Sequence, residues 1–135
     1  MAIELIHPAS LRSVWPAVRA GLDTLPPEEW IAEDVFHAIK SGDSALYVDR
    51  IDGAVVGFVV LRRLVDEFSG RVSCHVWIAH NAAGQETYDG ALDLYQHVAR
   101  QMGADRITFA SPRPGWAKRY QPITTTYEIP MESAP

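Results

Sequence analysis

Three side chains in the second half of this sequence have the chemical character to take part in a reaction. His75 and His80 lie within and just after the alternating apolar stretch from Val72 to Ala79. An imidazole titrates close enough to neutrality to serve as a general base. Tyr120 ends the only basic cluster of the chain, and its hydroxyl can donate a proton. These groups could therefore carry protons during a transfer reaction.

Other chemistries find no support in the sequence. Cys74 and His75 are adjacent on a predicted strand, so their side chains point to opposite faces and cannot form a nucleophilic pair. There is no GxSxG elbow, P-loop, HExxH or EF-hand pattern, and the five histidines lack the spacing of metal ligands. We therefore expect no metal centre.

Length and composition predict a soluble protein with one domain over residues 1–135. The single cysteine excludes an intrachain disulfide and favours the cytoplasm, and no signal-peptide pattern is present. The longest apolar run, Ala54 to Leu61, is far shorter than the roughly 20 residues of a membrane span, so we expect no membrane segment. The formal net charge of -5 and the lack of a basic stripe argue against nucleic-acid binding.

Hydrophobic periodicity predicts strands and helices in a mixed order. Strands are expected where apolar residues alternate, and helices where they recur every three or four positions. The predicted elements are a strand at 3–6, helices at 10–22 and 28–40, strands at 45–50, 54–64 and 72–79, a helix at 91–102, a strand at 106–110, a helical turn at 116–120 and a strand at 123–129. Gly42 and Gly103 are expected to end the second and third helices.

The strand at 72–79 is expected to alternate along its whole length. One face is predicted to carry Val72, Cys74, Val76 and Ile78, and the other Ser73, His75, Trp77 and Ala79. The helix that follows crosses over to the strand at 106–110, and such a crossover normally produces a parallel neighbour.

This order of elements, together with the loop at 80–89 and the segment SPRPGWAKRY from Ser111 to Tyr120, resembles the GNAT superfamily of N-acetyltransferases over nearly the whole chain. The compact GNAT-like proteins encoded by bacteriophages look most similar. The resemblance implies an α+β fold with a mixed, mostly antiparallel central sheet of about six strands flanked by helices.

The resemblance also implies that acetyl-CoA is the cofactor. The strands at 72–79 and 106–110 are expected to part at Ile78 and Phe109, so that the pantetheine arm lies in the gap. Val76 and Ile78 are then cofactor-binding residues, because the backbone of this stretch pairs with the pantetheine.

The loop before the third helix is expected to receive the diphosphate of the cofactor, because a helix N-terminus offers unpaired N–H donors. The loop residues assigned to this role are Ala83, Gly84, Gln85 and Thr87. Arg113 is expected to hold a CoA phosphate. The RxxGxG or RxxGxA pattern of the superfamily is not kept, and Glu86 and Asp89 add negative charge, so the cofactor loop is predicted to be degenerate.

By the same resemblance, Tyr120 matches the general acid that returns a proton to the departing CoA thiolate. Relatives often use a glutamate on the strand matching Val72 to Ala79 as the base, but no acid occupies that stretch here. His75 is the predicted base, with His80 as a second candidate.

Two hypotheses remain open from the sequence. In the first, the protein is an N-acyltransferase that transfers an acetyl group from acetyl-CoA to an unidentified amine acceptor. In the second, it is a non-catalytic GNAT-like module that binds a protein partner or forms a homo-oligomer, such as a phage virion or assembly protein. The second hypothesis places it in the host cytoplasm or the virion.

Overall fold

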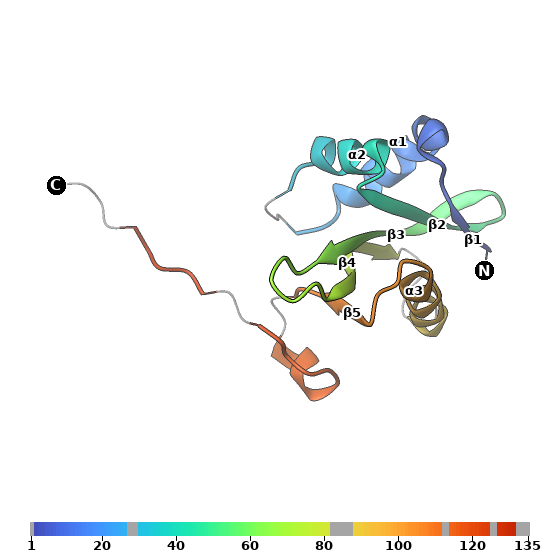
Figure 1. Cartoon of the computed structure of the whole chain (residues 1–135). Helices are drawn as coiled ribbons and strands as arrows, with labels where there is room; N and C mark the ends of the chain where they lie inside the picture. The colour runs from blue at the N-terminus through green and yellow to red at the C-terminus, as the bar shows by residue number, and fades with distance from the viewer. Residues whose placement is uncertain (1, 27–29, 82–87, 112–113, 125–126, 132–135) are drawn as a thin grey trace.

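The computed structural model describes residues 2–26, 30–81, 88–111, 114–124 and 127–131 (Figure 1). The strands are β1 (Ala2–Leu5), β2 (Ser44–Ile51), β3 (Ala54–Val65), β4 (Val72–Asn81) and β5 (Arg106–Phe109). The helices are α1 (Leu11–Leu22), α2 (Ala32–Ser41) and α3 (Tyr88–Gln101), with short 3-10 helices η1 (Pro8–Ser10) and η3 (Pro114–Lys118).

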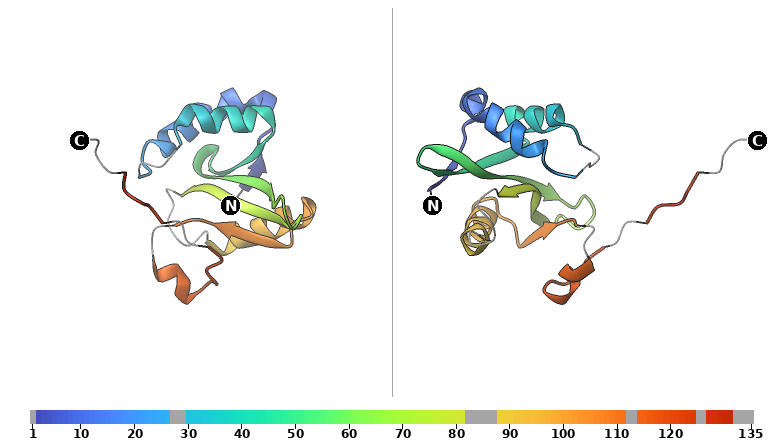
Figure 2. Two further views of the ribbon diagram at one scale, coloured as in Figure 1. Left: turned by 60° about the vertical axis from the view of Figure 1, so that its left-hand side comes forward. Right: turned by 180° about the vertical axis from the view of Figure 1, so that it is seen from behind.

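The strands form one sheet in the order β1-β2-β3-β4-β5. The first four strands are antiparallel, and β4 pairs with β5 in parallel, as the crossover through α3 predicted. Helices α1 and α2 cover one face of the sheet, and α3 lies on the other (Figures 1 and 2). The predicted α+β class with a mixed, mostly antiparallel sheet is therefore confirmed.

The sheet has five strands among the described residues rather than about six. The missing strand is the one predicted at 123–129. Its described residues form no strand, and Ile123, Tyr127 and Ile129 are exposed. A threonine-rich and branched sequence favours a strand, but a strand also needs a neighbour to satisfy its backbone hydrogen bonds, and none of the described strands pairs with the described part of this segment.

Two glycines end helices as predicted, and one helix begins later than predicted. Gly42 and Gly103 follow α2 and α3 with positive φ angles of 88° and 74°, which a residue without a Cβ adopts easily. Helix α2 begins at Ala32, not at residue 28. The backbone N–H of Ile31 donates to the Asp34 carboxylate at 3.2 Å, which satisfies one open donor at this helix start.

Each face of the sheet carries its own apolar cluster. The larger cluster lies under α1 and α2 and contains Ile6, Leu11, Val14, Val18, Leu22, Ala32, Val35, Ile39, Leu46, Val48, Phe58, Val60 and Ile78. The smaller cluster lies under α3 and contains Leu61, Cys74, Val76, Val98 and Ala99. Burying one large aliphatic side chain contributes about 1.5–3 kcal/mol, so the face under α1 and α2 holds most of the stabilisation.

A β-bulge in β4 changes which face its last residues occupy. Val60 of β3 pairs with Ile78, but Leu61 pairs with Val76, so Trp77 is an extra residue on β4. Val76 packs in the cluster under α3, whereas Ile78 packs in the cluster under α1 and α2. The prediction that these two residues share a face is therefore wrong, because the extra residue reverses the alternation.

Candidate active site

The parallel pairing of β4 and β5 stops part of the way along β4. It runs from Ser73 opposite Arg106 to Val76 opposite Phe109. Strand β4 continues to Asn81, so its residues after Val76 have no β5 partner in the described part of the chain. The strands were expected to part at Ile78 on β4 and Phe109 on β5. On β5 the pairing does end at Phe109, but on β4 it ends at Val76, two residues before Ile78.

The bulge at Trp77 lies at this opening. Bulges bend a strand and increase its local twist, which gives a physical reason for β4 to leave β5 here. Beyond the bulge, β4 has a strand partner on the β3 side only, as far as the described residues go. An extended ligand that carries amide groups, such as a pantetheine arm, could pair with the N–H and C=O groups of its other edge.

His75 lies on β4 within the paired region, on the face covered elsewhere by α1 and α2. Its Nδ1 lies 2.8 Å from Thr108 Oγ1 on β5. Its register partner on the other side is Arg62 of β3. Burial lowers the pKa of His75, and the neighbouring Arg62 cation lowers this pKa further. The imidazole is therefore neutral near pH 7 and able to accept a proton.

The hydrogen bond to Thr108 can also set the tautomer of His75. If Nδ1–H donates to the Thr108 hydroxyl, the lone pair of Nε2 is left for another group. Among the described residues, Nε2 has no hydrogen-bond partner. This arrangement suits a general base held in orientation by a neighbouring strand.

Two guanidinium groups lie on the same face of the sheet as His75. Arg106 Nε donates to Ser73 Oγ at 2.7 Å. The Arg62 guanidinium lies 4.7 Å from the centre of the Trp77 ring, and its Nε is buried without a hydrogen-bond partner. Neither arginine forms a salt bridge within the part of the chain that the structure describes. Arg62 is the cation that acts on His75, whereas Arg106 contributes to lowering the pKa of Asp66.

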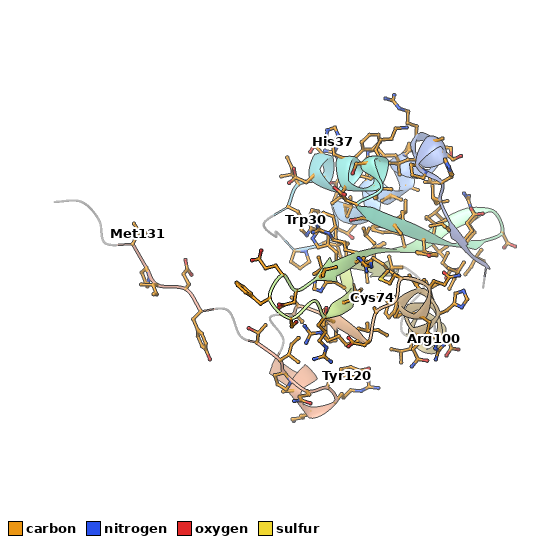
Figure 3. The ribbon with its side chains drawn as sticks, viewed as in Figure 1. Trp30, His37, Cys74, Arg100, Tyr120 and Met131 are labelled. Atoms are coloured by element: carbon orange, nitrogen blue, oxygen red, sulfur yellow. The ribbon has the colours of Figure 1, made fainter. Side chains whose placement is uncertain are left out.

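Tyr120 follows η3 and lies at the end of β5 (Figure 3). Its ring meets Phe109 edge-on, with the centroids 5.9 Å apart. The Arg119 guanidinium lies 5.9 Å from the centre of the same ring. Phe109 pairs with Val76, whose side chain packs under α3, so strand alternation places this contact on the face opposite His75. The structure brings Tyr120 to the opening, but not to the same face as His75.

His80, the second candidate base, has a packed position. Its ring lies 5.4 Å from that of Phe58, in a tilted arrangement. It also lies close to α1, because a Cβ atom on Gly21 would be only 2.8 Å from His80 Cδ2. These contacts favour a structural role for His80.

Cys74 is fully buried on the α3 side, in the interior of the molecule (Figure 3). Burial raises the pKa of its thiol, which keeps it protonated and poorly nucleophilic. The sequence interpretation, in which Cys74 and His75 point to opposite faces, agrees with their environments.

Five of the predicted cofactor-binding residues lie outside the described residues: Ala83, Gly84, Gln85, Thr87 and Arg113. Helix α3 begins at Tyr88, directly after this loop. Val76 and Ile78 are described, and both side chains are buried. If they contact a cofactor, they do so through the backbone of β4.

A hollow of about 390 Å³ lies elsewhere, between α1 and α2. It is lined by Arg12, Trp15, Pro16, Arg19, Glu33, Phe36 and His37. No residue of β4 or β5 contributes to it, so it is separate from the opening. In the described ranges, no three His, Cys, Asp or Glu side chains come together as a metal site. Within the same ranges, no helix is long and apolar enough to cross a membrane.

Comparisons with known proteins identify the fold. No family model matches the sequence, and no curated protein matches it. Solved structures do resemble the whole chain. A ribosomal-protein-alanine N-acetyltransferase from Brucella melitensis superposes with a TM-score of 0.70 at 17% identity, covering 97% of this chain and 100% of that chain.

Two further structures show the same likeness. A GNAT family acetyltransferase from Staphylococcus aureus has a TM-score of 0.69 at 12% identity, covering 96% of this chain and 98% of that chain. An acetyltransferase from Trypanosoma brucei has a TM-score of 0.62 at 13% identity, covering 96% and 99%. The chain therefore has the fold of the GNAT acetyltransferases. At these identities the likeness extends to the fold alone.

Sequence reasoning missed the neighbours that surround His75. Thr108 was part of a predicted strand, but its pairing with His75 depends on the register between β4 and β5. Arg62 lies two residues before the predicted end of its strand, and nothing local marks it as the register partner of His75. A register between strands far apart in the chain leaves no simple signal in one sequence.

Proposed function

We propose that this protein is an N-acetyltransferase that uses acetyl-CoA and an amine acceptor. The observation that carries the proposal is the opening at Val76 and Phe109, where β4 loses its parallel partner at a bulge. This opening offers an unpaired strand edge beside a neutral imidazole, in a protein with the fold of acetyltransferases.

The cofactor would be held by backbone and loop groups. The β4 backbone from Val76 to Ile78 and beyond pairs with the pantetheine arm. The diphosphate lies at the loop of Ala83, Gly84, Gln85 and Thr87, and Arg113 binds a phosphate. Acetyl-CoA supplies the acetyl group as a thioester, which is activated toward an amine.

The residues of the chain move the protons. His75 accepts a proton from the acceptor ammonium, so that the amine nitrogen has a lone pair for attack on the thioester carbonyl. The new C–N bond forms as the C–S bond breaks, and Tyr120 donates its hydroxyl proton to the departing thiolate. The nitrogen loses a second proton as it becomes an amide, and this proton restores the Tyr120 hydroxyl through solvent. Since His75 and Tyr120 lie on opposite faces, the amine arrives from the α1 and α2 side and the thiolate leaves toward η3 and α3.

The first test is binding of acetyl-CoA, measured as a shift in the thermal unfolding midpoint at millimolar cofactor. A ligand that binds only the native state stabilises it by about 2.7 kcal/mol at 100 times its Kd, which gives a shift of several degrees. ATP at the same concentration controls for a general polyphosphate effect. Equal midpoints with and without acetyl-CoA would overturn the proposal.

The second test separates the two proton carriers. With a panel of amines and a thiol-release assay, His75→Gln and Tyr120→Phe should each lower kcat by about 10²–10⁴-fold, because each removes one proton-transfer group. Both variants should keep the acetyl-CoA midpoint shift. The exposed His37→Gln variant is a matched control and should leave the rate unchanged.

The alternative is a non-catalytic interaction module, such as a phage virion or assembly protein with a degenerate cofactor loop. Its support is the set of exposed apolar side chains in the C-terminal segment, including Tyr127 at 83% and Ile129 at 87%. The comparisons give no support for a phage-encoded type. This alternative predicts that acetyl-CoA leaves the unfolding midpoint unchanged, and that Tyr120→Phe has no effect on any measured property of the protein.

A further inference from the structure

Four polar side chains form a row across the sheet. Ser44 on β2 pairs with Arg62 on β3, and Arg62 pairs with His75 on β4. His75 in turn pairs with Thr108 on β5. Residues paired across neighbouring strands point to the same face of a sheet. Arg62 lies two positions from Val60, which packs under α1 and α2, so alternation places the row on that face.

Only one half of this row satisfies its own polar atoms. His75 and Thr108 are within hydrogen-bond distance of each other. In contrast, Ser44 Oγ and Arg62 Nε are both buried, and neither has a hydrogen-bond partner among the described residues. Buried polar side-chain atoms in folded proteins nearly always have a partner. Two such atoms in one register pair therefore indicate a partner that the described chain does not supply.

The Arg62 guanidinium is held in one orientation with its end open. Its carbon atom lies 4.7 Å from the centre of the Trp77 ring, and an aromatic face of this kind fixes the plane of a guanidinium. Only Nε of the group is buried without a partner, so the two terminal nitrogens remain in contact with solvent. A planar fork of donors that is open at its end suits the oxygens of a carboxylate or a phosphate.

The strands around Arg62 supply no negative charge to it. Neither β3, β4 nor β5 contains an aspartate or a glutamate. Within the described part of the chain, Arg62 forms no salt bridge. A ligand that brings an anion would offset the cost of burying this cation, whereas an ammonium group alone would be repelled by it.

We propose that the acceptor amine carries a small oxyanion, a carboxylate or a phosphate, and that Arg62 binds this anion while His75 faces the ammonium. The inference rests on the proposed acetyl transfer and names the class of its acceptor. Directly opposed residues of an antiparallel pair have Cβ atoms about 4.5–5.5 Å apart, so only a few bonds separate the anion from the amine. A free amino acid or a short aminoalkyl phosphate meets this requirement. A lysine side chain within a protein does not.

The first test compares acceptors that differ only in the anion, using the thiol-release assay with acetyl-CoA. Glycine, β-alanine and phenylalanine are each measured against the amine that lacks the carboxylate: methylamine, ethylamine and phenethylamine. O-phosphoethanolamine is the phosphate arm and is also compared with ethylamine. The anionic member of the preferred pair should have a kcat/KM about 10–100-fold higher, as expected for hydrogen bonds to a charged group. The pair with the largest ratio identifies the anion.

The second test removes the cation. Arg62→Gln should raise KM for the anionic acceptor by about 10–100-fold and leave KM for the uncharged amine unchanged. The rates are compared at about pH 8.5, where His75 is neutral with or without the cation, so an effect on the base does not enter. Arg63→Gln is the matched control, because Arg63 is the next residue of β3 and its Nε donates to the Met102 carbonyl at 3.0 Å. This control should leave both KM values unchanged.

Binding can also be measured without turnover. In the presence of CoA, which cannot react, the anionic acceptor should shift the NMR signals of the His75 ring in the parent protein but not in Arg62→Gln. Three results would overturn the inference: equal kcat/KM within every pair, a preference that survives Arg62→Gln, or His75 signals that respond to no anionic acceptor. Each of them leaves the acetyl-CoA midpoint shift in place, so the proposed function would stand. An absent midpoint shift would instead overturn the proposed function and this inference with it.

Discussion

The imidazole of His75 lies between a hydroxyl on one neighbouring strand and a guanidinium on the other. Thr108 fixes the ring through Nδ1, and the Arg62 cation disfavours a second positive charge beside it. The two neighbours have separable effects, because one acts on orientation and the other on the pKa. A base role for His75 in the proposed reaction can therefore be tested through Arg62.

We predict that Arg62→Gln raises the pKa of His75. Removing the cation stabilises the imidazolium, so at a given pH below neutrality a smaller fraction of His75 is the neutral base. The acid limb of the pH–rate profile should move to higher pH. NMR titration of the His75 ring measures the same shift without an assay. Arg62→Lys, which keeps the charge, should leave the pKa near that of the parent.

The comparison of Arg62→Gln with Arg62→Lys tests whether the charge of Arg62 lowers the pKa of His75. If glutamine and lysine at this position shift the His75 titration equally, the cation is not what lowers its pKa, and burial alone is responsible.

Helix α1 can pack close to β4 because Gly21 has no side chain. A Cβ on Gly21 would lie 2.6 Å from Phe58 Cε1 and 2.8 Å from His80 Cδ2. Phe58 is 3% exposed and has little room to move. Gly21 thus sets how closely the helix approaches the far end of β4, where the strand has left β5.

We predict that Gly21→Ala destabilises the protein by about 1–3 kcal/mol, the usual cost of overpacking. In an uncrowded helix the same change would stabilise by about 1 kcal/mol, so the sign of the effect is informative. Urea unfolding measures it. The double variant with His80→Ala should lose less stability than the two single changes added together. A higher midpoint for Gly21→Ala would contradict this packing.

Most helices and strands were predictable from the periodicity of apolar residues, and the predictions that were wrong failed for physical reasons. The helices at α1 and α3 follow apolar spacings of three and four, and these spacings survive in the fold. The predicted strand at 123–129 failed because strand propensity does not supply a partner. The alternation along β4 failed after Val76, because a bulge depends on the neighbouring strand and Trp77 carries no local sign of it.

The candidate site was only partly predictable. His75 and Tyr120 could be selected by residue type and by family resemblance, but their placement on opposite faces follows from the register of β5 against β4. Thr108 and Arg62 acquire their roles from that three-dimensional register alone. No property of either residue in isolation indicates it.

For the whole molecule, the two apolar clusters are unequal. The cluster under α1 and α2 contains thirteen described buried residues, against five under α3. Local opening costs least where few apolar contacts are lost. The molecule should therefore open first on the α3 side, next to the loop assigned to the cofactor.

We predict that amide hydrogen exchange is slowest in β2 and β3 and clearly faster in α3 and β5. If acetyl-CoA binds as proposed, it should slow exchange in the second half of β4 and at the start of α3 more than in α1 or α2. Mass spectrometry of peptides from the intact protein measures both patterns. Equal protection of α1 and α3 without ligand would contradict the inequality of the two clusters.

The additional residue at Trp77 has a consequence for the length of β4. Deleting its codon would join Val76 to Ile78 while leaving them opposite Leu61 and Val60, so the later residues of the strand would keep the faces that they occupy now. The deletion would instead remove the bend that a bulge gives its strand. The shortened chain should therefore keep most of its core but lose the space proposed for acetyl-CoA, which would show as a folded protein whose unfolding midpoint does not respond to the cofactor.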